Sequence, residues 1–280
     1  MPLPTSLTDI DLNPLPVSCK ATDYPAGHVI SPHSHNKGQL VYAVHGVMVV
    51  SAQAGGALAS EAPPADGDAP GTLPVPSASG QWIVPPTRGI WIPPGLSHWI
   101  RCVGVVHMRS IYVRPDVAAR LPAQSQAVGI SPLLRELIRA ATEIATPYAP
   151  ASRDGRLMRL LLDELHALPV LPLHLPQPVE PRLRRICARL LAQPDDASTL
   201  GDWAQRLAVD AKTLQRLFAR ETGMTFGQWR QQARLLHGLE RLATGDKVVQ
   251  VALALGYESP SAFATMFKRQ FGQTPSEFFR

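Results

Sequence analysis

The chain has few of the features that mark secreted or membrane proteins. It has only three cysteines, Cys19, Cys102 and Cys187, and their spacing fits neither a disulfide framework nor a metal site. Such sparse cysteine usage is typical of a reducing compartment. No basic segment followed by an apolar run opens the sequence, and no apolar stretch approaches the length of a membrane span. We therefore expect a soluble, cytoplasmic protein that does not enter a membrane.

Negative charge is in deficit in only one part of the chain. Residues 1–179 contain 12 Lys and Arg against 12 Asp and Glu, whereas residues 180–280 contain 15 against 10. The formal net charge of +5 therefore arises entirely in the C-terminal region. A basic region beside a neutral one indicates a polyanionic partner for the basic region alone, although a solvated basic surface would give the same counts.

The C-terminal region contains an internal repeat with an offset of 49 residues. Residues 218–229 align with residues 267–278, so that Phe218 matches Phe267 and Gly223 matches Gly272. In each copy the glycine ends one helix, and a capping box of the form Thr-x-x-Gln or Thr-x-x-Glu begins the next. A repeat of this kind indicates one supersecondary unit used twice. The unit predicted here is a helix-turn-helix.

The first copy predicts a short helix, a tight turn and a second helix. Thr199 begins the short helix with a capping box, and Asp210 is a suitable N-cap for the next one. In that second helix Leu214, Leu217 and Phe218 recur at spacings of three and four and are expected to face inward. The outward residues are Lys212, Thr213, Gln215, Arg216 and Arg220. Such a face suits a DNA major groove, because Gln reads adenine and Arg reads guanine, but an ordinary solvated helical hairpin would also carry it.

The second copy repeats this arrangement after a long helical spacer. Residues 247–255 predict a helix, and Ser259 followed by Pro260 begins the next one. Between the copies, residues 226–243 predict one uninterrupted helix. At about 1.5 Å per residue it would be roughly 27 Å long, and successive major grooves on one face of B-DNA lie about 34 Å apart. The spacer therefore suits two recognition helices in neighbouring grooves.

The N-terminal region has the pattern of short β-strands. Residues 28–50 and 81–113 contain apolar runs separated by Gly and Pro turns, which favours an antiparallel barrel. His45-Gly46, between two such runs, predicts a hairpin turn. Residues 54–80 interrupt the pattern, are rich in Ala, Gly, Pro and Ser, and are expected to form a disordered loop.

Two amphipathic helices and a proline-rich stretch follow the strands. Apolar residues at helical spacing predict helices over residues 131–145 and 154–167. These helices either pack against the barrel or form a contact between two chains. Residues 169–181 contain five prolines and predict an extended linker.

The C-terminal motifs resemble the AraC/XylS family of transcriptional regulators. The resemblance rests on residues 214–223, Trp229-Arg230, 252–259 and 263–275, and it covers the last hundred residues densely. It implies that each recognition helix contacts DNA bases from its first turns. Carried over by position, these base contacts fall on Lys212, Gln215 and Arg216 in the first unit and on Pro260, Ser261, Ala264 and Thr265 in the second. Thr213, Arg220 and Lys268, on the same helices, are also expected to contact DNA. Some members carry Arg where this chain has Thr265, so phosphate or methyl contacts are expected from the second helix.

The N-terminal histidines resemble those of a cupin barrel. Gly27-x5-His33-x-His35-x3-Gln39-x6-Gly46 resembles the first cupin motif, with Gln in place of Glu, and Pro93-x-Gly95-x2-His98 resembles the second. The resemblance implies that three imidazoles converge, either to hold a divalent metal or to line an effector pocket. The expected effector-binding residues are His33, His35, Gln39, Tyr42, Trp91 and His98. If a metal binds, its expected ligands are His33, His35 and His98.

These features together predict an α+β protein with an N-terminal cupin-like β-barrel and an all-α domain containing two helix-turn-helix units. The expected parts are an effector-sensing barrel over 1–125, a helical packing or dimerisation element over 126–168, a linker over 169–181 and a DNA-binding domain over 182–280. The resemblance implies a homodimer that binds double-stranded promoter DNA under control of a small-molecule effector, and that contacts RNA polymerase if it activates. Neither catalysis nor a required cofactor is expected. Two alternatives are a metal-dependent, dioxygenase-like cupin enzyme fused to a DNA-binding domain, and a module whose basic domain binds an acidic protein.

Overall fold

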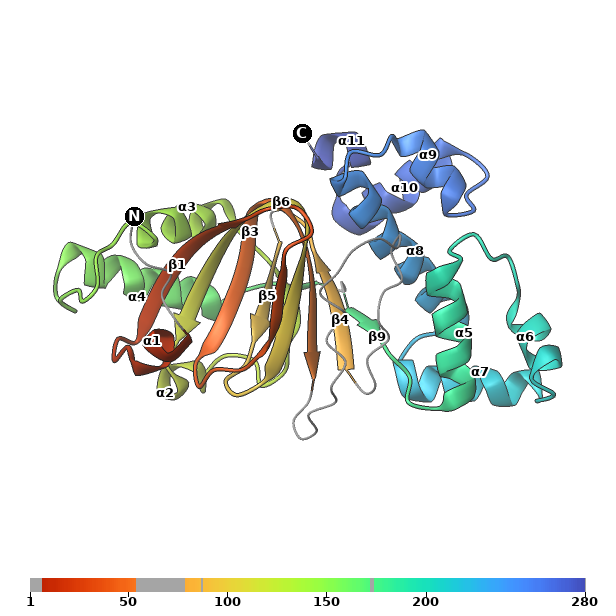
Figure 1. The fold of residues 1–280 in the computed structure, drawn as a ribbon, viewed down its shortest axis with the longest axis horizontal. Helices are drawn as coiled ribbons and strands as arrows, with labels where there is room; N and C mark the ends of the chain where they lie inside the picture. Colours follow the sequence, from red (N-terminus) through yellow and green to blue (C-terminus); the bar gives the residue numbers. More distant parts are fainter. Residues whose placement is uncertain (1–6, 54–78, 87, 172–173, 280) are drawn as a thin grey trace. The chain divides into compact units, whose positions relative to one another are not determined.

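The structure is a computed structural model that describes residues 7–53, 79–86, 88–171 and 174–279. The chain divides into two compact units, Met1–Ala57 with Val84–His174 and Leu58–Ile83 with Leu175–Arg280. Strands predominate in the first unit and helices in the second (Figure 1). The expected fold class, an antiparallel sheet region followed by a helical domain, is confirmed.

The first unit is built on a curled antiparallel sheet (Figure 1). Its strands follow the order β1 (Val17–Tyr24), β6 (Ser97–Val113), β3 (Gly38–Gln53), β5 (Arg88–Ile92), β7 (Gln126–Gly129) and β8 (Val170–Leu171), and β2 (Val29–His33) also pairs with β6. The two longest strands, β3 and β6, pair from Gly38 opposite Val113 to Gln53 opposite Ser97. Two short helices, α1 (Leu7–Leu12) and α2 (Pro115–Ala118), precede β1 and follow β6 in the sequence.

The prediction of a hairpin turn at His45-Gly46 is wrong. Strand β3 continues through these residues, and its register against β6 shifts on both sides of His45. Gly46 has a φ of 82°, and a Cβ built there would lie 2.2 Å from the backbone oxygen of Val105. The glycine therefore belongs to a β-bulge at which the neighbouring strand comes very close, rather than to a turn.

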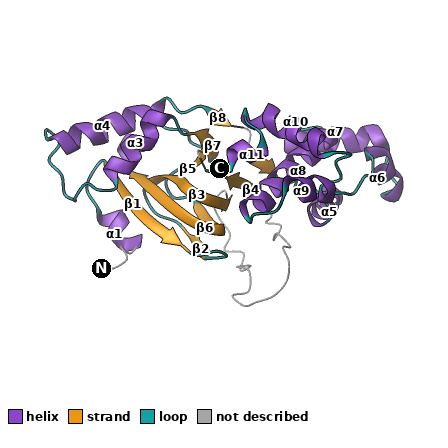
Figure 2. Cartoon of the chain, turned by 90° about the horizontal axis from the view of Figure 1, so that it is seen from above, coloured by secondary structure: helices purple, strands orange, loops and turns teal. Residues whose placement is uncertain are grey.

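Two helices cover one face of this sheet, as Figure 2 shows. α3 (Pro132–Ala141) begins at Ser131, whose hydroxyl accepts a hydrogen bond from the Leu134 N–H at 3.0 Å, and α4 (Arg153–His166) begins at Ser152 in the same way. Their apolar faces join one core cluster with residues of the sheet. The helical members of that cluster are Leu134, Leu137, Ile138, Ala141, Met158, Leu161 and Leu165. The helices therefore pack on their own sheet, while a dimer contact stays a prediction.

Three segments expected from the sequence differ in extent from the elements of the structure. Residues 54–78 of the expected loop lie outside the described residues, and Ser79 begins β4 (Ser79–Val84). The segment 126–168, expected as helical, starts with β7. The segment 169–181, expected as an extended linker, contains β8 and β9 (His174–Pro176), and β8 pairs with β7. Strands of two or three residues, such as β8 and β9, are too short to show an alternating pattern, so they could not be predicted from hydrophobic periodicity.

In its described residues the second unit is helical apart from β4 and β9, which pair with each other. Its helices are α5 (Pro181–Ala192), α6 (Leu200–Arg206), α7 (Ala211–Thr222), α8 (Phe226–Ala243), α9 (Val248–Ala254), α10 (Pro260–Phe271) and α11 (Pro275–Phe278). As expected, α7 and α10 each end at a left-handed glycine, Gly223 with a φ of 67° and Gly272 with a φ of 79°. The expected capping boxes at Thr199, Thr225 and Thr274 are all present.

Helix α8 contributes to the cores of both repeat units. Near its start, Trp229 is fully buried, its ring lies 6.2 Å from that of Phe218 in α7, and its indole N–H donates to the backbone oxygen of Pro176 at 2.8 Å. Farther along, α8 comes very close to α9 and α10. A Cβ at Gly238 would lie 3.1 Å from side-chain atoms of Leu255 and Phe263. Both units are therefore attached to one 18-residue helix.

The sequence predicts neither a disulfide framework nor a membrane span. The three cysteines are free thiols, and Cys102 and Cys187 are buried. Within the described ranges, none of the helices combines the length and the apolar character needed to cross a membrane.

Replacing Gly46 by Ala should destabilise the protein more than the same change at Gly27. Both glycines have positive φ values, 82° and 77°, but a Cβ at Gly27 would meet no atom within 4 Å. We expect Gly27→Ala to cost about 1 kcal/mol of unfolding free energy through backbone strain alone. Gly46→Ala should cost about 3 kcal/mol, because the strand carrying Val105 must also move. Chemical denaturation measures both, and equal losses would contradict the close approach of the strands.

Candidate functional site

The first half of α7 presents polar and basic side chains to solvent. Asp210 caps the helix, and its carboxylate accepts a hydrogen bond from the Thr213 N–H at 3.0 Å. Leu214 and Phe218 are fully buried, which turns the opposite face outward. On that face Thr213 is half-buried, and the exposed side chains are Lys212, Gln215, Arg216 and Arg220. All five residues expected to contact DNA from this helix are therefore accessible.

Helix α10 begins in the same way. The hydroxyl of Ser259 accepts a hydrogen bond from the Ala262 N–H at 3.1 Å, and Pro260 occupies the first turn, where its missing N–H costs nothing. Phe263 and Phe267 are fully buried. Of the residues expected to contact DNA from this helix, Ser261, Thr265 and Lys268 are exposed. Pro260 and Ala264 are half-buried. This face carries fewer cations than that of α7.

The two recognition helices lie on the same side of α8. In Figure 1 they lie near opposite ends of α8, and in Figure 2 both follow one edge of the unit while α5 and α9 follow the other. Because α8 is one continuous helix of 18 residues, it separates them by a fixed distance. Its length of roughly 27 Å is comparable with the repeat of about 34 Å between major grooves on one face of B-DNA.

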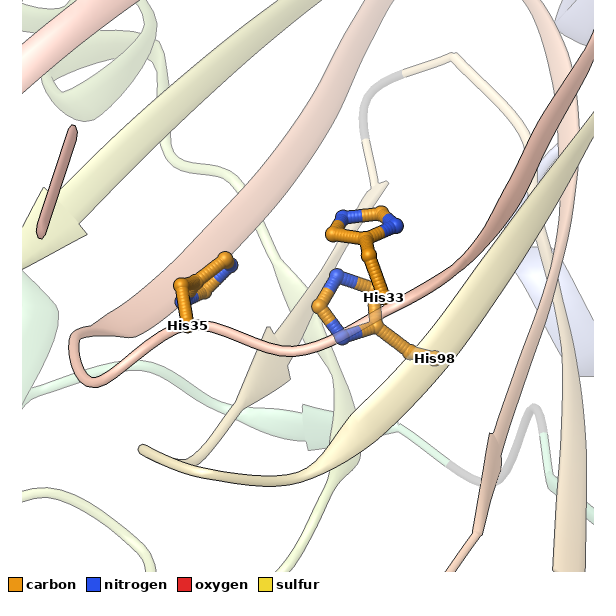
Figure 3. A group of neighbouring side chains, drawn as sticks. All are labelled: His33, His35 and His98. Atoms are coloured by element: carbon orange, nitrogen blue, oxygen red, sulfur yellow. The ribbon is translucent and has the colours of Figure 1, made fainter. Parts of the chain in front are cut away.

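Three histidines converge inside the first unit, as the sequence motifs indicated (Figure 3). His33 ends β2 and pairs with His98 in β6, while His35 lies in the turn that follows β2. One ring nitrogen from each histidine lies within 4.8 Å of the other two. His35 and His98 are buried and His33 is half-buried.

Backbone carbonyls set the tautomer of all three rings. The Nδ1 atoms of His33, His35 and His98 lie 2.8, 2.7 and 3.0 Å from the carbonyl oxygens of Ser31, Lys37 and Leu96. A carbonyl oxygen can only accept, so each Nδ1 carries the hydrogen. In a neutral ring the Nε2 atom then carries a lone pair. Metal-binding histidines are commonly oriented by such second contacts.

The side-chain oxygen of Gln39 faces two of these nitrogens. Gln39 is buried, and its Oε1 lies 3.0 Å from Nε2 of His35 and 3.1 Å from Nε2 of His98. Its amide nitrogen donates to the hydroxyls of Ser110 and Tyr112 at 3.1 and 3.2 Å. Lone pairs of neutral rings and of a carbonyl oxygen therefore point toward each other, an arrangement that a cation between them would stabilise.

A proton is not expected to be that cation, because burial disfavours protonation of the rings. Desolvation lowers the pKa of His98 to about 3, and repulsion from the His33 ring adds to the effect. Desolvation and the neighbouring His35 also lower the pKa of His33 below its ordinary value, although its contact with the Ser31 carbonyl partly opposes this. These two rings are therefore neutral at neutral pH.

A cavity of about 350 Å³ lies beside the histidines. Of the residues expected to bind an effector, His33 and Gln39 line it, and His35 and His98 lie behind it in contact with Gln39. Polar lining also comes from β1 and β6, at Lys20, Thr22, Tyr24, Ser110 and Tyr112. A cavity with an apolar wall and a few convergent polar groups is typical of a small-molecule site.

The other two expected effector-binding residues lie elsewhere in the same unit. Tyr42 and Trp91 belong to the core cluster beneath α3 and α4, and the indole N–H of Trp91 donates to the backbone oxygen of Pro122 at 2.7 Å. In contrast, polar residues of β1 line the cavity although the sequence did not lead us to expect them there. The available signal was their period of two, Lys20, Thr22 and Tyr24, which places all three on one face of a strand.

Comparisons with known proteins match this chain to helix-turn-helix proteins. Residues 203–280 match a protein family described as a helix-turn-helix domain. The chain is 34% identical over 246 residues, 88% of its length, to the HTH-type transcriptional regulator NimR of Escherichia coli strain K12, of which the match covers 81%. It is 36% identical over 104 residues to the HTH-type transcriptional regulator RipA of Corynebacterium diphtheriae, covering 37% of this chain and 31% of that protein.

Among solved structures, ToxT from Vibrio cholerae is similar over 95% of this chain and 98% of its own, with 10% identity and a TM-score of 0.35. Likeness at that level supports no inference about this chain. The similarity to NimR covers most of both chains, and it agrees with the duplicated helix pairs of the second unit, in which both recognition helices are capped. The chain is therefore a helix-turn-helix transcriptional regulator that belongs to the AraC/XylS family.

Proposed function

We propose that the chain binds promoter double-stranded DNA with α7 and α10 in successive major grooves. The observation that carries this proposal is the position of two similarly capped helices on one side of α8, each with its polar face accessible. The excess of basic residues over 180–280, 15 against 10, favours contact with the phosphate backbone. A module that binds an acidic protein would not need two matched helices at this spacing.

The two helices make unequal contributions to sequence selectivity. On α7, Arg216 and Lys212 suit the acceptors of guanine, and Gln215 suits adenine, with Thr213 and Arg220 beside them. On α10 the residues expected to contact DNA have smaller side chains, and only Lys268 among them is charged. The small residues are Pro260, Ser261, Ala264 and Thr265. We infer that α7 supplies most of the selectivity and that α10 adds affinity through backbone and methyl contacts.

The cavity beside the histidines is the proposed effector site. A small molecule held there controls DNA binding if it binds one state of the regulator more tightly than another, because only that difference shifts the equilibrium. The polar side chains of β1 and β6 would orient such a ligand against the apolar wall formed by Ile30, Ile100 and Met108. No catalytic step is assigned to the cavity.

Arg216→Ala should cost about 1–3 kcal/mol of DNA-binding free energy and relax selectivity at one base pair. The matched control is Arg185→Ala, which removes an exposed arginine from α5. Fluorescence anisotropy with the DNA upstream of neighbouring genes, and with its single-base variants, measures both. Equal weakening on every sequence would show that Arg216 contacts only the backbone, and no binding by the unaltered chain would overturn the proposed function.

Ile30→Trp should abolish the response to the effector and leave DNA binding intact. Ile30 is half-buried and lines the cavity, so an indole there fills space that a ligand needs. Val29→Trp is the control, because Val29 is the adjacent residue of β2, is 36% exposed and lies on the other face of the strand. A reporter gene behind the target promoter, tested against a small-molecule panel, gives the readout. An unchanged response in Ile30→Trp would place the effector elsewhere.

We further propose that the histidine cluster holds a divalent transition metal, with His33, His35, His98 and Gln39 as its donors. The observation that favours it is the convergence of imidazole nitrogens and an amide oxygen, all presenting lone pairs. Imidazole suits zinc, iron, nickel and copper, so this donor set fits such an ion. The ion would supply a Lewis-acidic contact for the effector. None of the four donors is a carboxylate, and we therefore propose recognition rather than oxygenase chemistry.

Equilibrium dialysis against Zn²⁺ or Ni²⁺ should find one ion per chain. His98→Ala should weaken binding at least about tenfold, whereas Gln39→Glu should strengthen it by adding a charged donor. His45→Ala is the control, since His45 is exposed and its ring lies 5.6 Å from His107 rather than in the cluster. Sub-stoichiometric metal, or equal losses in both histidine variants, would favour an ion-free cluster in which the Gln39 amide donates to the two rings.

A further inference from the structure

A second concave surface lies within the helical unit. A groove of about 410 Å³ runs between the first half of α8 and the middle of α10. Its lining includes Gly227, Arg230 and Arg234 of α8, Tyr257, and Thr265 and Arg269 of α10. None of the residues assigned to DNA contact by sequence lies in it except Thr265. The rest of the groove therefore lies outside the expected base-contacting residues.

The lining is cationic. It contains three arginines and no carboxylate. Two of them are held by the protein. Arg234 donates to the backbone oxygen of Pro194 at 2.6 Å and lies over the ring of Tyr257, and Arg230 donates to the backbone oxygen of Ser198 at 3.1 Å. Their carbonyl partners fix the guanidinium groups without cancelling their charge.

The third arginine has no such partner. Arg269 is exposed, and its guanidinium makes neither a hydrogen bond nor an ion pair with any other described residue. Burial lowers the pKa of Arg234, and repulsion from Arg230 lowers it further, whereas Tyr257, Asp195 and Asp196 oppose the shift, so Arg230 and Arg234 repel each other. An anion placed in the groove would relieve that repulsion.

The first turn of α8 adds to the positive potential. Gly227 lies in that turn and lines the groove, and a Cβ there would meet no atom within 4 Å, so the helix end is open on this side. The amino end of an 18-residue helix carries a partial positive charge and suits phosphate groups. The arginines and the helix end therefore act on the same space.

The position of the groove indicates which anion it meets. Thr265 and Arg269 are one helical turn apart on α10, so a residue expected to reach the DNA and an unpaired cation share one face. The groove also adjoins α8, the helix that separates the two recognition helices. We propose that it binds a phosphodiester of the DNA backbone between the two contacted major grooves, through Arg269 and Arg230. This inference rests on the proposed DNA-binding function.

Arg269→Gln tests the proposal in the full-length chain. DNA affinity should fall about tenfold at low salt, by the same factor on the target sequence and on a scrambled one. The slope of log K against log salt should become shallower by about 1, because one phosphate contact is lost. Arg185→Gln is the matched control, since it removes the same charge from an exposed position on α5. Thermal unfolding of both variants checks that the fold is unchanged.

Three results would overturn the proposal while leaving the DNA-binding function in place. The first is an unchanged affinity and salt slope in Arg269→Gln. The second is an equal effect of Arg185→Gln, which would mean that only net charge matters. The third comes from titrating inorganic phosphate alone. Saturable binding at sub-millimolar concentration, lost in Arg269→Gln, would identify a free-anion site instead. If the unaltered chain failed to bind DNA, the proposed function itself would be the failure.

Discussion

The packing of α8 in two hydrophobic cores is the constraint on which the regulator depends. Near its start Trp229 packs against Phe218 of α7, and at Gly238 the helix comes so close to α10 that an added Cβ would lie 3.1 Å from the Phe263 ring. A core contact fixes a helix in rotation as well as in distance, because protein interiors are close-packed. Two recognition helices attached in this way keep one spacing and one orientation, as reading a duplex requires.

In the sheet unit, backbone hydrogen bonds and burial set the geometry and charge of the histidine cluster. Backbone carbonyls orient three imidazoles, and burial keeps His33 and His98 neutral. The result is a cluster in which one ring nitrogen of each histidine lies within 4.8 Å of the other two, beside a cavity with polar walls. Gln39 stands where the cupin motif has Glu, so the cluster lacks a carboxylate donor, which is the basis of our proposal of effector recognition rather than oxygenase chemistry.

Much of the helical unit could be predicted because its signals are local. Asp210, Thr225 and Gly223 cap helices through contacts that span at most four residues, and the structure has each of them as expected. The sheet depends on distant partners instead. Gly46 has the local pattern of a turn, but the approach of Val105 makes it a bulge. Tyr42 and Trp91 point into the core under α3 and α4 rather than into the cavity, because strand pairing decides which face is inside.

Hydroxyl-radical footprinting of the full-length chain on its target promoter is the most direct test of the fixed spacing. If α8 holds both recognition helices on one face of the duplex, two protected patches should appear with centres about 10 base pairs apart on that face. A single patch, or two patches on opposite faces of the DNA, would contradict the account.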